Sequence, residues 1–146
     1  GNGTARIFHG DPAVFTFSIH QENNYPMKEQ SDLDIGLPDG IEDAAYLAAL
    51  EPAVHQVLQA HDPDLVLMVA GADPYREDLL GGLRLSLDGL RRRDALVVRA
   101  CAEHGVPVVG LTAGGYARVL ADTVAIHCNT TREILAWPRY AKRSNS

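Results

Sequence analysis

Residues 65–70 read Leu-Val-Leu-Met-Val-Ala, a continuous apolar run that leads directly into Gly71-Ala72-Asp73-Pro74. Such an uninterrupted run is typical of a strand that is buried on both faces of a parallel sheet. A second run, Pro-Val-Val-Gly-Leu, occupies residues 107–111, and apolar residues at helical spacing lie between the two runs. This alternation of strand and helix predicts an α/β fold with a mainly parallel sheet flanked by helices.

Helices are predicted around both apolar runs. Residues 42–61 carry apolar side chains at helical spacing, and Asp-Pro-Asp at 62–64 ends this helix. The next helix is indicated by Leu90, Val97, Cys101 and His104, and is closed by Gly105. A last main helix is expected to begin between Tyr116 and Leu120, with a further short helix near residues 131–136.

The N-terminal part of the chain is predicted to hold one strand and one long loop. Residues 13–19, Ala-Val-Phe-Thr-Phe-Ser-Ile, are rich in β-branched and aromatic residues and predict a strand. Residues 20–40 are polar and contain Asn, Pro and Gly, so they predict a loop. A loop of about 20 residues is longer than an ordinary connection, and such loops often carry function.

Composition excludes several classes of protein. The 146 residues, 46% of them hydrophobic, suffice for one domain with a core. A net charge of -6 argues against a nucleic-acid binder, and the run Arg91-Arg92-Arg93 is predicted to be a solvated helix face. No apolar run approaches the ~18 residues of a membrane span. The two cysteines, Cys101 and Cys128, are predicted to be free thiols in a cytoplasmic protein.

Ligands of open parallel sheets bind at the carboxyl ends of the strands, which here selects the loops that begin near residues 20, 71 and 112. Asp73 follows a strand directly and has small neighbours. Its carboxylate could serve as a metal ligand, a general base or a cap, and spacing alone favours a cap or turn. Asp78 is likewise predicted to be a turn residue. His20 is predicted to be a structural hydrogen-bonding residue.

Gly114-Gly115-Tyr116 follows the second apolar run and places a phenol at the same end of the sheet as Asp73. This phenol could donate a hydrogen bond to a developing oxyanion, or it could pack at a helix start with its hydroxyl in solvent. The two glycines alone do not form a phosphate-binding loop, because neither GxGxxG nor GxxxxGK[ST] is present.

Seven short motifs follow one another along nearly the whole chain. They are Gly1-Asn-Gly-Thr4, Thr16-Phe-Ser-Ile-His20, Asn24-Tyr25-Pro26, Ser31-Asp-Leu-Asp34, Leu37-Pro-Asp-Gly40, Ala70-Gly-Ala-Asp-Pro74 and Gly114-Gly-Tyr116. In this order they resemble the zinc-dependent histone deacetylase family of the arginase/deacetylase fold. The closest resemblance is to small bacterial and class IV-like members, and this implies that the sequence covers the C-terminal half of that fold.

The resemblance implies a role for three residues of the active site. Asp73 corresponds to a zinc ligand, and Tyr116 to the tyrosine that hydrogen-bonds the substrate carbonyl and the tetrahedral intermediate. Tyr25 corresponds to an aromatic wall of the acyl-lysine tunnel. Gly114 and Gly115 lie beside this tunnel and, having no side chains, keep it open.

The resemblance also implies two further cation sites. The hydroxyl of Ser18 and the carbonyl of Ile19 correspond to a structural potassium site near the zinc. Phe8, Asp11 and Val14 correspond to a second, more peripheral cation site. The resemblance supports this site less strongly than the potassium site.

One departure from the family pattern limits what this chain can do. The Asp-x-His-x segment that supplies the other two zinc ligands, and the His-His pair that moves protons, are not in residues 1–146. A catalytic zinc needs about three protein ligands. We therefore expect residues 1–146 to form the C-terminal part of a single deacetylase domain, inactive alone, and to need the N-terminal half or to self-associate.

For the complete enzyme, the resemblance implies zinc-assisted hydrolysis of an amide in an acetylated lysine protein or another acetylated amine. Neither nucleic acid nor membrane is expected as a direct partner. Two alternatives remain at this point: a non-catalytic interaction module, and a flavodoxin-like domain that binds a nucleotide.

Overall fold

The two apolar runs form neighbouring parallel strands. In the computed structural model, which describes residues 1–140, β3 (Val66–Gly71) pairs with β4 (Val108–Ala113). Leu67 lies opposite Val109 and Val69 lies opposite Leu111, so these four side chains share one face of the sheet. Both strands agree with the runs predicted at 65–70 and 107–111, and the parallel α/β class is confirmed.

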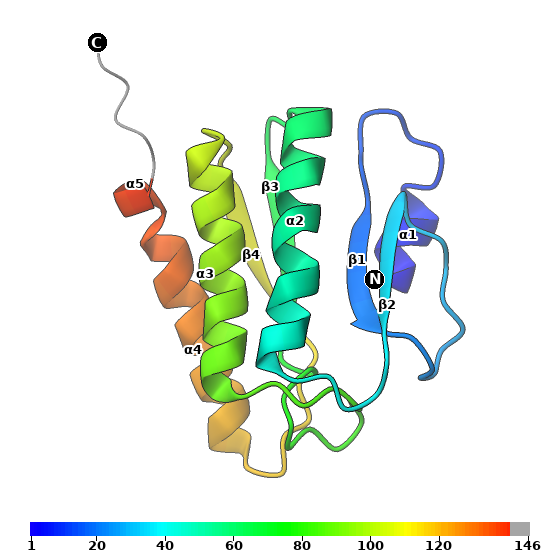
Figure 1. Cartoon of the computed structure of the whole chain (residues 1–146), viewed down its shortest axis with the longest axis vertical. Helices are drawn as coiled ribbons and strands as arrows, with labels where there is room; N and C mark the ends of the chain where they lie inside the picture. The colour runs from blue at the N-terminus through cyan, green and yellow to red at the C-terminus, as the bar shows by residue number, and fades with distance from the viewer. Residues whose placement is uncertain (141–146) are drawn as a thin grey trace.

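Two long helices lie along the same face of these strands (Figure 1). They are α2 (Asp43–His61) and α3 (Leu87–Glu103), close to the helices predicted from spacing. Each ends as predicted, because Asp62 adopts the left-handed conformation with φ 42° and Gly105 follows α3 with φ 74°. The core forms where these helices meet the strands and a later helix, α4 (Leu120–Leu135). Its most completely buried side chains include Leu85, Leu90, Val98, Cys101 and Ile126.

A second pair of parallel strands lies beside α2. It consists of β1 (Phe17–Gln21) and β2 (Leu33–Leu37). The strand predicted at 13–19 is displaced toward the C-terminus, because the amide and hydroxyl of Thr16 both donate to the carboxylate of Asp32 instead of entering the ladder. These two hydrogen bonds lower the pKa of Asp32. The predicted loop at 20–40 was wrong in part, since β2 lies within it.

The helices at the two ends of the described chain also differ from the prediction. A short helix, α1 (Asn2–Ile7), lacks a capping side chain at its start and was not predicted. The prediction of a separate short helix near residues 131–136 is wrong, because residues 131–135 belong to the single helix α4 (Leu120–Leu135). A short α5 (Trp137–Tyr140) follows it.

Among residues 1–140, no helix lies over one face of the β3–β4 sheet (Figure 1). The alternate residues that point away from the helices are large and apolar, yet Leu67 is 59% exposed and Val69 is 57% exposed. Their partners on β4, Val109 and Leu111, are 43% and 42% exposed. Parallel strands are normally covered on both faces, so this face has the character of a surface that packs against further polypeptide.

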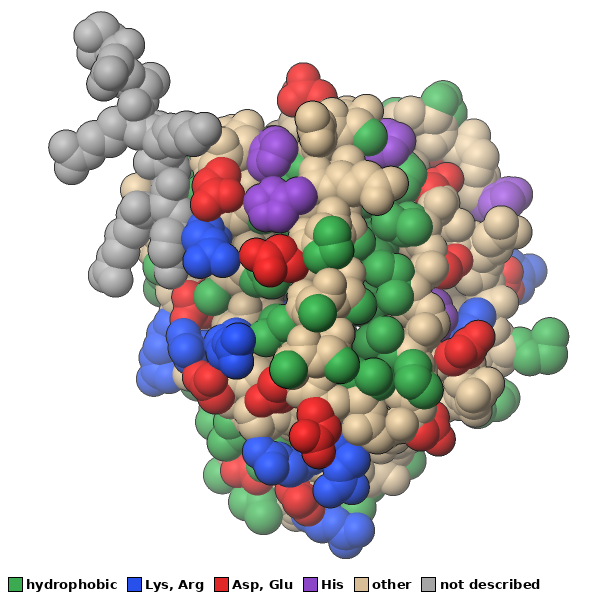
Figure 2. All heavy atoms as spheres, viewed as in Figure 1, with side chains coloured by type: hydrophobic (Ala, Val, Ile, Leu, Met, Phe, Trp, Pro, Cys, Tyr) green, Lys and Arg blue, Asp and Glu red, His purple; other side chains and the backbone are tan. Residues whose placement is uncertain are grey.

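The predictions for the charged side chains and the cysteines are confirmed, except for the exposure of one arginine. On the face that Figure 2 shows, basic and acidic side chains are interspersed. Arg91 pairs with Asp88 and Glu133 at the surface, but Arg93 is buried, so a solvated face for the whole arginine run was wrong. Cys101 and Cys128 are both free thiols, as predicted. Within residues 1–140, no helix combines the length and the apolar character that crossing a membrane requires.

Candidate functional site

The loops that follow β3 and β4 are joined at the carboxyl end of the sheet (Figure 1). The amide of Ala72 donates to the carbonyl of Gly114 at 2.6 Å. A Cβ atom on Gly115 would come within 2.8 Å of the Cβ of Ala72, so only glycine allows this approach. Asp73 and Tyr116, each one residue beyond these contacts, are thereby brought onto adjoining loops.

The carboxylate of Asp73 lies among glycines. A Cβ atom on Gly71 would overlap Oδ1 of Asp73, and one on Gly114 would lie 3.5 Å from the same oxygen. Asp73 stands in a turn, as its spacing favoured, because the amide of Tyr75 donates to the carbonyl of Ala72 at 3.1 Å across it. The cap alternative is wrong. In the described part of the chain its side chain makes no hydrogen bond, and Ser86 caps the helix that follows. Asp73 therefore presents a carboxylate whose oxygens are free to accept a ligand.

Asp78 forms the predicted turn and a further link that spacing did not reveal. Its Oδ1 accepts hydrogen bonds from the amides of Leu80 and Gly81, both at 2.8 Å. Its Oδ2 accepts from the amide of Tyr116 at 2.6 Å. The side chain of Tyr116 is 57% exposed and precedes α4 by four residues, so the phenol is accessible at the rim of the sheet.

The third loop joins the site through Gln21, the last residue of β1. The amide of Gly82 donates to Oε1 of Gln21 at 2.8 Å, and Nε2 of Gln21 donates to Asp39 at 2.7 Å. Tyr25, predicted to wall a tunnel, is 94% exposed in the loop between β1 and β2. The three loops selected from the sequence therefore lie at the same end of the molecule.

Ser18 and Ile19, the residues of the predicted potassium site, lie in β1. The hydroxyl of Ser18 is 2.8 Å from Nδ1 of His20, so His20 has the structural hydrogen-bonding role predicted for it. Burial lowers the pKa of His20, against the opposing effect of Asp34. Gly1 lies against the same hydroxyl, because a Cβ atom there would be 2.8 Å from Oγ of Ser18.

Phe8, Asp11 and Val14, predicted to form a second cation site, lie in consecutive turns between α1 and β1. The amide of Asp11 donates to the carbonyl of Phe8 at 3.0 Å, and that of Val14 donates to the carbonyl of Asp11 at 3.2 Å. The side chain of Asp11 accepts from the amide of Ala13 at 2.9 Å. The structure thus links the three residues within one short segment.

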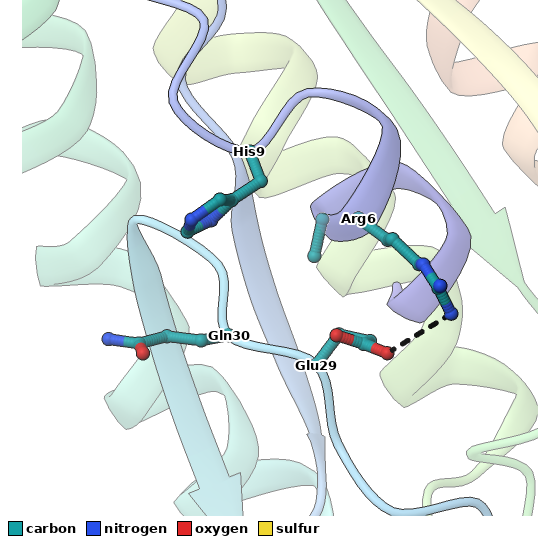
Figure 3. Close-up of a pocket in the computed structure, with 5 residues that line it drawn as sticks. Arg6, His9, Glu29 and Gln30 are labelled. Carbon is teal, nitrogen blue, oxygen red and sulfur yellow. Dashed lines mark ion pairs between the residues drawn. The ribbon is translucent and has the colours of Figure 1, made fainter.

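Hollows elsewhere on the surface do not include these residues. One, of about 210 Å³, lies between α1 and the loop before β2, where Arg6 faces Glu29 at 3.9 Å beside His9 (Figure 3).

The rings of His55 and His104 come together with centroids 5.8 Å apart, which sequence spacing did not indicate. Within the described residues, no group of three His, Cys, Asp or Glu side chains could hold a metal ion.

Comparison with known proteins bears on the family and the fold of this chain. The family model for the histone deacetylase domain matches residues 1–131. The chain belongs to the histone deacetylase family. The arginase/deacetylase-like architecture is confirmed, and the flavodoxin-like alternative is wrong, because the family match covers almost all of the described chain.

Three relatives of this deacetylase-family chain show how much of the fold it covers. An uncharacterized protein of Picosynechococcus sp. is 46% identical over 128 residues, which span 87% of this chain and 43% of that protein. Histone deacetylase 2 of Arabidopsis thaliana is 33% identical over 85% of this chain and 34% of its own length. The crystal structure of an acetylpolyamine aminohydrolase from Burkholderia pseudomallei, 22% identical, has a TM-score of 0.75 over 92% of this chain and 42% of its own. The chain therefore spans less than half the length of these relatives.

Two contacts in this deacetylase-family chain were missed by the sequence predictions. The link from Asp78 to Tyr116 joins residues 38 positions apart, and no local pattern marks it. The burial of Arg93 was missed because a run of three arginines suggests solvent. The signal that could have found it is the acidic residue next in sequence, Asp94, with which Arg93 pairs.

Proposed function

We propose that this chain forms part of the active site of a zinc-dependent deacetylase that hydrolyses an acetylated lysine or another acetylated amine. The observation that supports this most directly is the juxtaposition of the Asp73 and Tyr116 loops through the Ala72–Gly114 hydrogen bond. Asp73 supplies an unengaged carboxylate, and Tyr116 supplies an exposed phenol on the adjoining loop.

The described residues do not by themselves fit a catalytic zinc. Such a site takes about three protein ligands and an open position, and the described chain holds no group of three His, Cys, Asp or Glu side chains that would include Asp73. We therefore propose that Asp73 is one ligand of a site completed by another segment. Ser18 and Ile19, and more weakly Phe8, Asp11 and Val14, are proposed to hold potassium or another monovalent cation.

The chemistry proposed for this chain's own residues centres on Tyr116. Its hydroxyl donates a hydrogen bond to the carbonyl oxygen of the acetyl group, and this bond strengthens as negative charge develops on that oxygen. Tyr25 would flank the acyl chain, with Gly114 and Gly115 leaving room for it.

The uncovered face of the β3–β4 sheet supports the second part of this proposal. The relatives contain more than half of their length outside the matched region. We propose that a further segment packs on Leu67, Val69, Val109 and Leu111 to complete the domain, and that residues 1–146 alone are inactive. This chain together with that segment is called the complete domain.

Zinc content and turnover of a fluorogenic acetyl-lysine peptide test the proposal. The chain alone should bind no stoichiometric zinc and release no acetate, whereas the complete domain should bind zinc and turn over. Turnover by the chain alone would disprove the need for a second segment. A complete domain that binds no zinc and shows no turnover would favour the alternative, a non-catalytic interaction module.

A further inference from the structure

Asp78 connects the two loops that carry the proposed active-site residues. One carboxylate oxygen, Oδ1, closes the turn at Leu80 and Gly81, and the other, Oδ2, accepts the amide hydrogen of Tyr116. Hydrogen bonds to an ionised carboxylate are shorter and stronger than neutral ones, in keeping with the 2.6 Å separation from Tyr116. A single side chain thus links the turn in the loop after β3 to the loop after β4.

The backbone of Tyr116 is held on both of its polar groups. Its amide donates to Asp78, and its carbonyl accepts from the amide of Leu79 at 3.0 Å. The amide of Arg118 donates to the carbonyl of Glu77 at 3.1 Å, so residues 77–79 and 116–118 form a short antiparallel bridge. Asp78 lies at the centre of this bridge, opposite Ala117.

The side chain of Tyr116 has little packing of its own to direct it. It is 57% exposed, whereas Tyr75 in the neighbouring loop is 7% exposed and donates to Asp122 at 3.1 Å. For an exposed phenol, the position of the hydroxyl depends on where the backbone places the residue. A misplacement of about 1 Å at a reacting centre can cost on the order of a hundredfold in rate.

We propose that Asp78 is a positioning residue for Tyr116: its carboxylate holds the Tyr116 amide so that the phenol points at the acetyl carbonyl of the substrate. This inference rests on the proposed function of Tyr116. Asp78 itself does not touch the substrate and acts only through the backbone of Tyr116. Its loss therefore lowers kcat and leaves KM nearly unchanged.

Asp78→Asn separates the turn from the link to Tyr116. The remaining carbonyl oxygen of Asn can still accept from the amides of Leu80 and Gly81. The amide nitrogen that replaces the second oxygen cannot accept from Tyr116. Asp78→Ser is a second variant, because a hydroxyl preserves a weak turn but is too short to reach both loops. Asp88→Asn is the matched control, since Asp88 is exposed on α3 and pairs only with Arg91 in the described residues.

A double-mutant cycle in the complete domain, followed by turnover of the acetyl-lysine peptide, tests the inference. Asp78→Asn should lower kcat about tenfold, the effect expected for loss of a hydrogen bond to a charged group, with KM within about twofold. In a Tyr116→Phe background the same substitution should change kcat less than about twofold, because no phenol hydroxyl remains to be positioned. Asp78→Ser should behave like Asp78→Asn, and Asp88→Asn should match the parent.

Three results would overturn the inference. The first is an equal loss of kcat from Asp78→Asn with and without the Tyr116 hydroxyl, which indicates a general structural role. The second is an effect confined to KM. The third is a kcat for both Asp78 variants equal to that of the parent. If Tyr116→Phe alone keeps full activity, the proposed function of Tyr116 fails as well, so the two failures can be told apart.

Discussion

The guanidinium of Arg93 donates a hydrogen bond of 2.7 Å to the carboxylate of Asp94, its neighbour in α3, and both side chains are buried. Nη1 of Arg93 also donates to the carbonyl of Gly71 at 2.7 Å, at the end of β3. The second oxygen of Asp94 accepts from Thr130 of α4 at 2.5 Å. This ion pair therefore ties α3 to both α4 and the strand that leads to Asp73.

Removing Arg93 alone should destabilise the protein strongly. Arg93→Met leaves the Asp94 carboxylate buried without its cation, and breaking a buried pair in this way costs about 3–5 kcal/mol. Arg93→Met combined with Asp94→Leu should cost clearly less, because no charge remains and Thr130 keeps its bond to the carbonyl of Ile126. Urea unfolding of the complete domain measures both. A double variant as unstable as Arg93→Met would show that the pair is worth more than its desolvation cost.

Tyr116→Phe should abolish most turnover without unfolding the protein. The substitution removes only the hydroxyl, and losing one oxyanion donor typically lowers kcat by ~10²–10³-fold. Because the side chain is 57% exposed, the midpoint of thermal unfolding should change little. Steady-state kinetics on the acetyl-lysine peptide, with zinc content measured in parallel, check this. Near-normal kcat would remove Tyr116 from the proposed chemistry.

Gly71→Ala should impair activity through Asp73. A Cβ atom at residue 71 overlaps Oδ1 of Asp73, so the carboxylate must move away from its present position. We expect kcat of the complete domain to fall at least about tenfold, in line with the sensitivity of reaction rates to small misplacements. Gly3→Ala is the control, since a Cβ atom at residue 3 would meet no described atom within 4 Å. Equal losses from the two substitutions would contradict the steric explanation.

The uncovered sheet face should make the isolated chain self-associate. Leu67→Glu together with Leu111→Glu places charge on this face and should shift the chain toward monomer in sedimentation velocity, because burying unpaired carboxylates is costly. Leu135→Glu is the control: Leu135 is 74% exposed on α4 and should leave association unchanged. A parent chain that is monomeric at all concentrations would contradict the prediction.

The two thiols should differ in reactivity. Burial raises the pKa of Cys101 from 9.0 to about 11, whereas Cys128 is exposed. At pH 8, a thiol reagent should modify Cys128 rapidly and Cys101 only after unfolding. Rapid modification of both thiols in the native chain would contradict the burial of Cys101.

The raised pKa of Cys101 makes the free energy of unfolding depend on pH. Above about pH 9 the unfolded thiol of Cys101 loses its proton and the folded thiol keeps it, so the free energy of unfolding falls as pH rises toward 11. Between pH 8 and pH 10 the parent should lose about 1 kcal/mol more than Cys101→Ala in urea unfolding. An identical pH dependence of the two proteins would contradict this.

Elements with a clear local pattern could be predicted from the sequence, and elements without one could not. β3 is an uninterrupted apolar run, and apolar residues recur at helical spacing through α2 and α3, so local preference and burial agree there. β2 has only five residues, and its alternation of apolar and polar residues was hidden within a polar stretch. Its place in the sheet depends on pairing with β1, which is not a local property.

The sequence by itself determined the parallel α/β class, the family, and the presence of Asp73 and Tyr116 beyond the ends of two strands. Only the tertiary structure decided that the carboxylate of Asp78 accepts a hydrogen bond from the amide of Tyr116, and that Arg93 is buried against Asp94. The reason is that apolar periodicity is set by neighbours a few residues away. The partner of a buried charge or of a loop amide is instead set by how distant segments pack.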